Sequence, residues 1–530
     1  MYNKPSAATQ GDTPNPLTAA YGQPSPSSIP IGVPLFGAGG QDSAVPMANY
    51  AVVQPLKPTQ VRGEVQNESK YRDAWAAVLF IVMFAAVAFV GLKNAGSALG
   101  GSTSAPTPAP SGSGPSLTSA QLHRIFTIGA TLLAMGAALS LCWLLLLIRL
   151  AERMIRVTLK LSAAMFLAIA AVLAAKGAAI PAAVCALLGM LTLCYYYCVQ
   201  GEIPFAGANL SVACEAVQAH RGTIGVSFLA LVLQLAWMLL WILCAASIYR
   251  ANAPVCTNAQ QMCERKVAWG PYFGLLVSFF WGLQVFRNVS HTTTAGAVGS
   301  WWFRPQDTAV VGGALRRACT WSFGSICFGS LLVAILRALE QMARNARKGG
   351  GEEGALACVL ECILAQLRAL LEWINRWAFT YVGIYGYSFA VAGQAVFDLF
   401  KTRGWTMIIN DGLIENTLSL VALMNGALCA GVGVALVTAE KSSFQGAGLL
   451  DGGDLLQQAQ IAVAVVGFLV GLAMSTVVMS VVESAACTVF VGFAQDPNAL
   501  RVGRPAAHHR LMLAYMARHR GVLVQCGYIQ

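Results

Sequence analysis

Long apolar blocks, separated by shorter polar connections, make up most of the chain. Each block holds roughly 18 to 28 residues, which is enough for a helix rising 1.5 Å per residue to cross a hydrocarbon layer of ~30 Å. The expected fold class is therefore all-α, a polytopic membrane protein. The pattern predicts about ten transmembrane helices, at residues 74–92, 125–148, 157–175, 178–199, 223–249, 272–296, 319–338, 374–397, 412–438 and 461–483.

Polar stretches flank this apolar region at both ends. Residues 1–68 are rich in Pro, Gly, Ser, Gln and Ala, and such a segment buries too little apolar surface to offset the entropy lost on ordering. We therefore expect a disordered cytosolic tail at residues 1–68, a membrane domain at 70–497 and a basic cytosolic tail at 498–530.

The charge content supports a membrane protein. Only 11% of the residues are charged and 56% are hydrophobic, whereas about a quarter of a soluble domain is charged. The net charge is +11, and the basic residues gather at the ends of apolar blocks instead of forming a basic stripe with stacking aromatics. The lipid bilayer is thus an expected partner and nucleic acid is not. The positions of the basic loops favour a cytosolic amino terminus.

One segment does not fit a simple alternation of ten spans. Residues 337–376 carry six basic side chains, yet alternation places them on the outer side. Within this segment, the stretch CVLECILAQLRALLEW (358–373) puts Glu361, Arg368 and Glu372 on one helical face and apolar residues on the other. This pattern predicts a helix lying in the membrane interface.

Most of the fifteen cysteines lie inside apolar blocks, where a thiol behaves as a small apolar group. Cys256 and Cys263 differ because they lie in a polar loop. In an oxidising compartment this pair can close as a disulfide, and two free thiols are the alternative. The cysteines show no zinc-site spacing, and we expect no cofactor.

A polar block, RNVSHTTTAGAVGSWWF (287–303), directly follows the apolar run of the sixth predicted span. In one interpretation the span ends near Phe286, and the block is a linker whose tryptophans anchor at the interface. In the other, the helix continues and lines a cavity, so that side chains such as Asn288 and His291 face other helices or water.

Several blocks resemble, in the same order, the choline transporter-like family. They are NVSHTTTAGAVGSWWF, ALRRACTWSFGSICFGSLLVAILRALE (314–340), NRWAFTYVGIYGYSFAVAGQAVFDLF (375–400), IINDGLIEN (408–416) and ESAACTVFVGFAQDP (483–497). The resemblance covers roughly residues 70–515 and departs at Tyr387, where many relatives have a basic residue. It implies a ten-span carrier for choline, with ethanolamine as a second substrate in some members. By the same analogy we expect the plasma membrane, with a mitochondrial or other internal membrane as the alternative.

The chemistry of choline suggests which side chains would hold it. A quaternary ammonium has no N–H to donate, so aromatic faces bind it best, each contributing ~0.5–2 kcal/mol, with a carboxylate nearby. Its hydroxyl needs a polar partner. The substrate-binding candidates are Trp281, Asn288, Trp301, Tyr381, Tyr385, Asp411 and Glu483, and family similarity favours Asp411 and Glu483. Ordinary helix packing, interface anchoring and salt bridges are the competing explanations for these residues.

These features favour a carrier that moves choline or a related small organic cation by alternating access. A non-transporting membrane scaffold, with the amino-terminal tail as its interaction surface, is the alternative. We do not expect an enzyme, because the sequence has no HExxH motif, no Ser–Lys or Ser–His arrangement and no paired membrane aspartates.

Overall fold

The computed structural model describes residues 70–93, 119–251, 269–307, 309–348, 351–439 and 453–525. Within these ranges every regular element is a helix, and the described residues up to 520 form a single unit. The predicted tail at residues 1–68 and the cysteine pair Cys256 and Cys263 lie outside the described residues.

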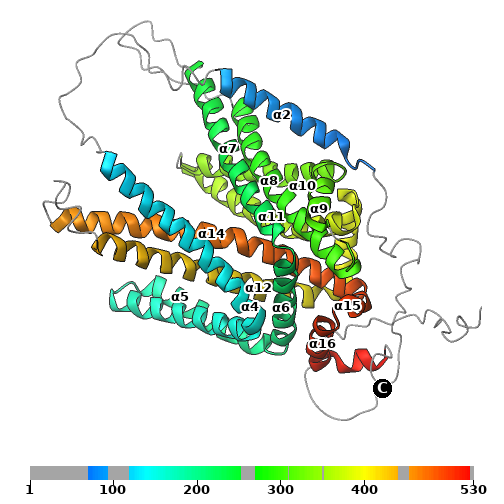
Figure 1. The fold of residues 1–530 in the computed structure, drawn as a ribbon. Helices are drawn as coiled ribbons and strands as arrows, with labels where there is room; N and C mark the ends of the chain where they lie inside the picture. The colour runs from blue at the N-terminus through cyan, green and yellow to red at the C-terminus, as the bar shows by residue number, and fades with distance from the viewer. Residues whose placement is uncertain are drawn as a thin grey trace, which may run out of the picture. The chain divides into compact units, whose positions relative to one another are not determined.

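Figure 1 shows the arrangement of the helices. They are α2 (Ala74–Lys93), α4 (Ser119–Ala175), α5 (Ala179–Val199), α6 (Ile203–Ala219), α7 (Gly222–Ala251), α8 (Trp269–Phe303), α9 (Val310–Cys319), α10 (Phe323–Arg347), α11 (Gly351–Tyr385), α12 (Phe389–Ala439), α14 (Gly453–Gln495), α15 (Pro497–Gly503) and α16 (Pro505–Gln525).

The predicted spans lie in these helices. In the described part of the chain, 8 helices are long and apolar enough to cross a membrane by length and composition. One of these stretches, Phe126–Ala175 in α4, is 50 residues long and contains two predicted spans. The helix kinks between them, at Leu150 (φ −120°, ψ 15°). A further predicted span, 272–296, lies in α8. The all-α polytopic fold class is therefore confirmed.

The predicted span at residues 374–397 is interrupted. Helix α11 ends at Tyr385, Gly386 adopts a φ of 63°, and α12 begins at Phe389. The carboxylate of Asp73, just before α2, accepts hydrogen bonds from the Phe389 backbone N–H (2.9 Å) and the Ser325 hydroxyl (2.7 Å). An aspartate in this position satisfies a backbone donor that the start of a helix leaves unpaired.

The prediction of a separate interfacial helix at residues 358–373 is wrong. These residues form the middle of the continuous helix α11, and the stretch Gly354–Tyr385 is itself a candidate span. Its apolar side, including Leu356, Val359 and Ile363, is exposed in the bundle, as expected for contact with lipid. Its charged side packs against α10. A charged face against a neighbouring helix and a charged face against water have the same sequence periodicity.

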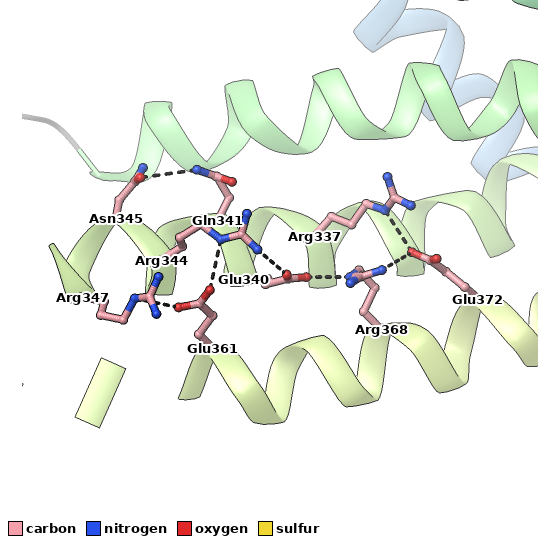
Figure 2. Close-up of polar contacts among 9 residues, drawn as sticks. All are labelled: Arg337, Glu340, Gln341, Arg344, Asn345, Arg347, Glu361, Arg368 and Glu372. Carbon is pink, nitrogen blue, oxygen red and sulfur yellow. Dashed lines mark hydrogen bonds and ion pairs between the residues drawn. The ribbon is translucent and has the colours of Figure 1, made fainter. Parts of the chain in front are cut away.

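Alternating charges connect α10 with α11, as Figure 2 shows. Successive pairs lie at N–O distances between 2.6 and 3.2 Å and run in the order Arg347, Glu361, Arg344, Glu340, Arg368, Glu372 and Arg337. We call these seven residues the α10–α11 ladder. Each carboxylate contacts two guanidinium groups, so charges that lipid would exclude compensate one another.

Helices α12 and α14 run side by side (Figure 1) and approach at backbone distance. A Cβ atom placed on Gly471 of α14 would lie 2.8 Å from the carbonyl oxygen of Asn425 on α12. The Asn425 side-chain amide donates to the Gly471 carbonyl (2.8 Å) and to that of Gly136 on α4 (3.2 Å). Glycine at position 471 is therefore what permits this contact, as is common where transmembrane helices meet.

Sequence patterning missed helix α6. It is short, and twelve of its residues, including Phe205 and Asn209, are buried against other parts of the protein. Glu215 of α6 pairs with Arg510 of α16 at 2.6 Å, so α6 also holds the carboxyl-terminal helices. The segment predicted as a basic tail contains nearly all of α15, which begins at Pro497, and all of α16.

Candidate functional site

A cavity of about 860 Å³ lies among α7, α8, α10, α11, α12 and α14. Its lining includes three carboxylates, two guanidinium groups and several amides and hydroxyls, together with apolar residues of α7 and α14. The charged lining residues are Arg287, Glu372, Arg376, Glu415 and Glu483. Such a mixture of polar and charged groups within an apolar bundle indicates a site for a small polar molecule.

The polar block of α8 forms one wall of this cavity. The helix runs unbroken to Phe303, so the second of the two interpretations is correct. Asn288, Ser290 and His291 line the cavity. The Asn288 amide donates to the Ser330 hydroxyl of α10 (2.9 Å), and Ser290 bonds to Ser227 of α7. These polar side chains thus find partners on neighbouring helices, as burial in a membrane bundle requires.

His291 connects α8 to two other helices. Its Nε2 lies 2.9 Å from the backbone carbonyl oxygen of Arg376 on α11, and its Nδ1 lies 2.7 Å from the Ser484 hydroxyl on α14. A carbonyl oxygen only accepts, so Nε2 carries a hydrogen. In the neutral ring Nδ1 is an acceptor, and the single hydrogen of the Ser484 hydroxyl can go either to Nδ1 or to the Ser480 carbonyl oxygen at 2.8 Å. The small residues that follow let α8 and α11 approach closely at Gly296.

Arg376 sits among three carboxylates. Its guanidinium contacts Glu483 of α14 directly and lies 3.4 Å from Asp411 and 3.5 Å from Glu415, both of α12. The Arg376 side chain is 17% exposed, whereas that of Glu415 is 55% exposed. We call these four residues the Arg376 cluster. Trp373, one turn earlier on α11, donates its indole N–H to Asp411 (2.8 Å). The cluster joins α11 to α12 and α14.

Three of the sequence-predicted site residues lie at or beside the cavity. Asn288 and Glu483 line it, and Asp411 lies directly behind Arg376 and Trp373. Trp281 does not line it. The Trp281 indole N–H donates to the Cys327 carbonyl (2.9 Å), and its ring packs in an apolar cluster with Phe80 and Val285. Trp301, also buried, lies 5.6 Å from the guanidinium carbon of Arg504.

The predicted tyrosine pair lies further along α11. Tyr381 and Tyr385 are neighbours on one helical face, as their spacing implies, with ring centroids 5.9 Å apart. The ring of Tyr387 stacks on that of Tyr385, with 5.4 Å between the ring centroids. The ring centroid of Phe303 on α8 lies 6.2 Å from that of Tyr385. Gln495 of α14 donates to the Tyr381 hydroxyl. The four rings form a buried or half-buried group that we call the tyrosine cluster, and none of them lines the cavity.

Sequence reasoning did not assign Trp373 and Arg376 to the site. Trp373 is the last residue of the stretch 358–373 predicted to lie in the interface, and Arg376 follows it closely, so neither is a candidate on the sequence alone. Trp373 and Arg376 are three residues apart, and they lie four residues after Ala369 and Glu372, respectively. This helical spacing was the available sign that the four residues lie on one side of the helix. Among the described residues, no group of three His, Cys, Asp or Glu side chains is arranged to hold a metal ion.

Comparison with known proteins identifies relatives. The family model described as plasma-membrane choline transporter matches residues 183–498, which include every lining residue of the cavity. Protein PNS1 of Neurospora crassa is 28% identical over 337 residues, covering 62% of this chain and 59% of the relative. Protein PNS1 of Cryptococcus neoformans var. neoformans serotype D is 28% identical over 352 residues, with coverages of 63% and 62%.

A third relative is the CTL-like protein of Dictyostelium discoideum, which is 27% identical over 344 residues, covering 63% of this chain and 56% of the relative. The chain spans about three fifths of the length of the curated relatives it matches.

Proposed function

The chain belongs to the choline transporter-like family of membrane transporters, and from that premise we propose that it is a carrier for choline or a related small organic cation. The carrier works by alternating access, ethanolamine is a second candidate substrate, and the plasma membrane is the proposed location. A multi-pass bundle of apolar helices that contains a polar cavity supports this proposal.

The charge of the cavity is the observation that carries the proposal. Of the three carboxylates that line it, Glu372 is already paired with Arg337 and Arg368 of the α10–α11 ladder. The excess of carboxylate lies around Arg376, where Asp411, Glu415 and Glu483 share one guanidinium. The balance is negative, so the site attracts a cation and disfavours an anion. An excess of carboxylate inside a membrane bundle is costly unless a cation compensates it.

Three side chains supply the contacts that choline requires. Trp373 offers an aromatic face to the trimethylammonium group, worth ~0.5–2 kcal/mol, and its hydrogen bond to Asp411 holds the ring in place. Glu483 supplies negative charge, and Asn288 supplies a polar partner for the hydroxyl. Trp281 and Trp301 are proposed to support this site through packing, since they do not line the cavity.

Alternating access requires that the cavity be closed on one side at a time. We assign this closure, in the conformation described here, to the tyrosine cluster, in which Tyr381 and Tyr385 are held by Gln495 and Phe303. Tyr381 and Tyr385 follow Arg376, the last cavity-lining residue of α11, by roughly one and a half and two and a half helical turns. In this proposal the predicted tyrosine pair contacts a passing substrate only after the cluster separates.

Uptake of labelled choline into vesicles that contain the purified protein tests the proposal. A potential of either sign is imposed across the membrane, and empty vesicles provide the background. We expect uptake that increases when the vesicle interior is negative. A non-transporting scaffold would give background counts under both signs, and that result would refute the carrier.

A further inference from the structure

Two of the three carboxylates that line the cavity already pair with the same cation of the protein, Arg376. Glu415 and Glu483 line the cavity, and both contact the guanidinium of Arg376. Asp411, the third carboxylate around this guanidinium, is buried and also accepts from Trp373. A positively charged substrate that enters the cavity therefore meets carboxylates whose charge Arg376 has partly cancelled.

The position of Arg376 in the fold is also distinctive. The α10–α11 ladder holds α10 and α11 together, and backbone contact at Gly471 holds α14 against α12. Within the described ranges, every observed ion pair from α11 to α12 or α14 uses Arg376. The same guanidinium thus neutralises the cavity and connects one pair of helices to the other.

Glu415 and Glu483 cannot pair fully with Arg376 and with a substrate cation at the same time. An ammonium group near Glu415 and Glu483 repels the guanidinium and competes with it for their charge. Because Glu415 is half-exposed, it is the member of the cluster that an incoming cation reaches most easily. Loss of these contacts leaves Arg376 paired with Asp411 alone and weakens the connection from α11 to α12 and α14.

We propose that Arg376 is the internal counter-cation of the carrier. An organic ammonium replaces it at Glu415 and Glu483, which frees the α10–α11 pair to move relative to α12 and α14. When the substrate leaves, Arg376 returns to the carboxylates and neutralises the empty cavity, so that the empty carrier can return through the membrane. This role rests on the proposed carrier function, and it makes Arg376 a positioning residue for transport and not a contact for substrate.

The substitution Arg376→Gln should strengthen choline binding and slow net choline uptake. Without the guanidinium, Asp411, Glu415 and Glu483 lose the positive charge that they share, so choline should bind about tenfold more tightly. The empty carrier then holds uncompensated charge, and net uptake into choline-free vesicles should fall about tenfold or more. Exchange of external labelled choline for choline inside the vesicles avoids the empty carrier, and it should stay within about threefold of the parent.

Three further variants complete the design. Arg376→Lys keeps the charge and should retain more net uptake than Arg376→Gln. Arg376→Gln combined with Glu415→Gln restores part of the charge balance and should recover part of the net uptake. Arg156→Gln, an exposed arginine of α4 that pairs with Glu152, is the matched control and should behave as the parent.

The outcomes are distinct. If choline affinity is unchanged in Arg376→Gln, or if exchange and net uptake are lost in parallel, the counter-cation role is refuted. If Arg376→Gln does not fold, judged by its elution profile and thermal unfolding, Glu415→Gln replaces it. That variant removes a carboxylate that both cations share, so weaker choline binding supports the proposal and unchanged binding refutes it.

Uptake by the parent protein distinguishes failure of the carrier function from failure of the role proposed for Arg376. Background uptake by the parent refutes the carrier function itself. An active parent whose Arg376→Gln variant loses net uptake and exchange together refutes the role of Arg376 and leaves the carrier function standing.

Discussion

Trp373 is the only aromatic residue that lines the cavity in the described part of the chain. It was not predicted, whereas Trp281 and the tyrosine pair were chosen for their residue type and their place in apolar runs. Composition identifies side chains able to bind a quaternary ammonium, but only the packing of α8, α11 and α14 determines which of them faces the cavity. Asn288 and Glu483, which do line the cavity, are predictable as polar groups that need partners, because a polar group within an apolar block is costly wherever the helices pack.

Replacing Trp373 tests its contact with the substrate. In Trp373→Ala the aromatic face is lost, and the KM for choline should rise about tenfold. Trp373→Phe keeps a ring but not the donor to Asp411, so its KM should lie between those of the alanine variant and the parent. The measurement is initial uptake against choline concentration in vesicles.

Trp75→Ala is the matched control for this experiment. Trp75 is an exposed residue of α2 whose ring contacts Phe328, and it does not line the cavity. Its replacement should leave the KM near that of the parent. An equal rise in KM for both variants would contradict a specific role for Trp373.

At the scale of the elements, the apolar runs predicted nearly all the spans, because length and hydropathy alone specify a helix that crosses lipid. They did not predict the break at Gly386, since a break of three residues hardly changes the hydropathy of the run. Nor did they reveal α6, whose burial depends on protein contacts and not on lipid. The α10–α11 ladder could not be predicted for a similar reason. The periodicity of a charged helix face is the same whether that face pairs with another helix or contacts water.

Glu340 lies at the centre of the ladder and contacts both Arg344 and Arg368. Glu340→Gln should lower the free energy of unfolding by about 1–3 kcal/mol, a value reduced from that of a fully buried pair because the arginines are partly exposed. Thermal unfolding of the purified protein measures the change. Lys401→Gln, which breaks an exposed pair with Asp398, should have almost no effect.

The contact between α12 and α14 can be tested with two alanine substitutions. In Gly471→Ala the new Cβ would lie 2.6 Å from the Cys429 sulfur and 2.8 Å from a backbone oxygen, so the helices must separate. We expect destabilisation of about 1–3 kcal/mol. Gly431→Ala, where a Cβ meets nothing within 4 Å, should be neutral or stabilise by up to about 1 kcal/mol. Destabilisation of equal size in both variants would contradict this account.

At the scale of the whole molecule, a carrier that moves one positive charge responds to the membrane potential without any coupled ion. A potential of 100 mV is worth ~2.3 kcal/mol per charge, so choline should accumulate roughly fiftyfold inside vesicles whose interior is negative. The ratio of internal to external choline at steady state, measured over a series of imposed potentials, checks this value. Accumulation that does not depend on the potential would show that the charge of choline is balanced by another ion.

The carboxylate of Asp73 has a practical consequence for shortening the chain. It holds the first turn of α12 and the hydroxyl of Ser325, and the backbone N–H of the preceding Arg72 donates to the Trp321 carbonyl at 3.0 Å. A truncation that removes the Pro- and Gly-rich start should therefore stop before residue 70. Deletion through Asp73 would remove the hydrogen bonds that join the start of α2 to α10 and α12, two residues from Tyr387 of the tyrosine cluster. It should therefore weaken the closure proposed for that cluster, although no residue that lines the cavity had been removed.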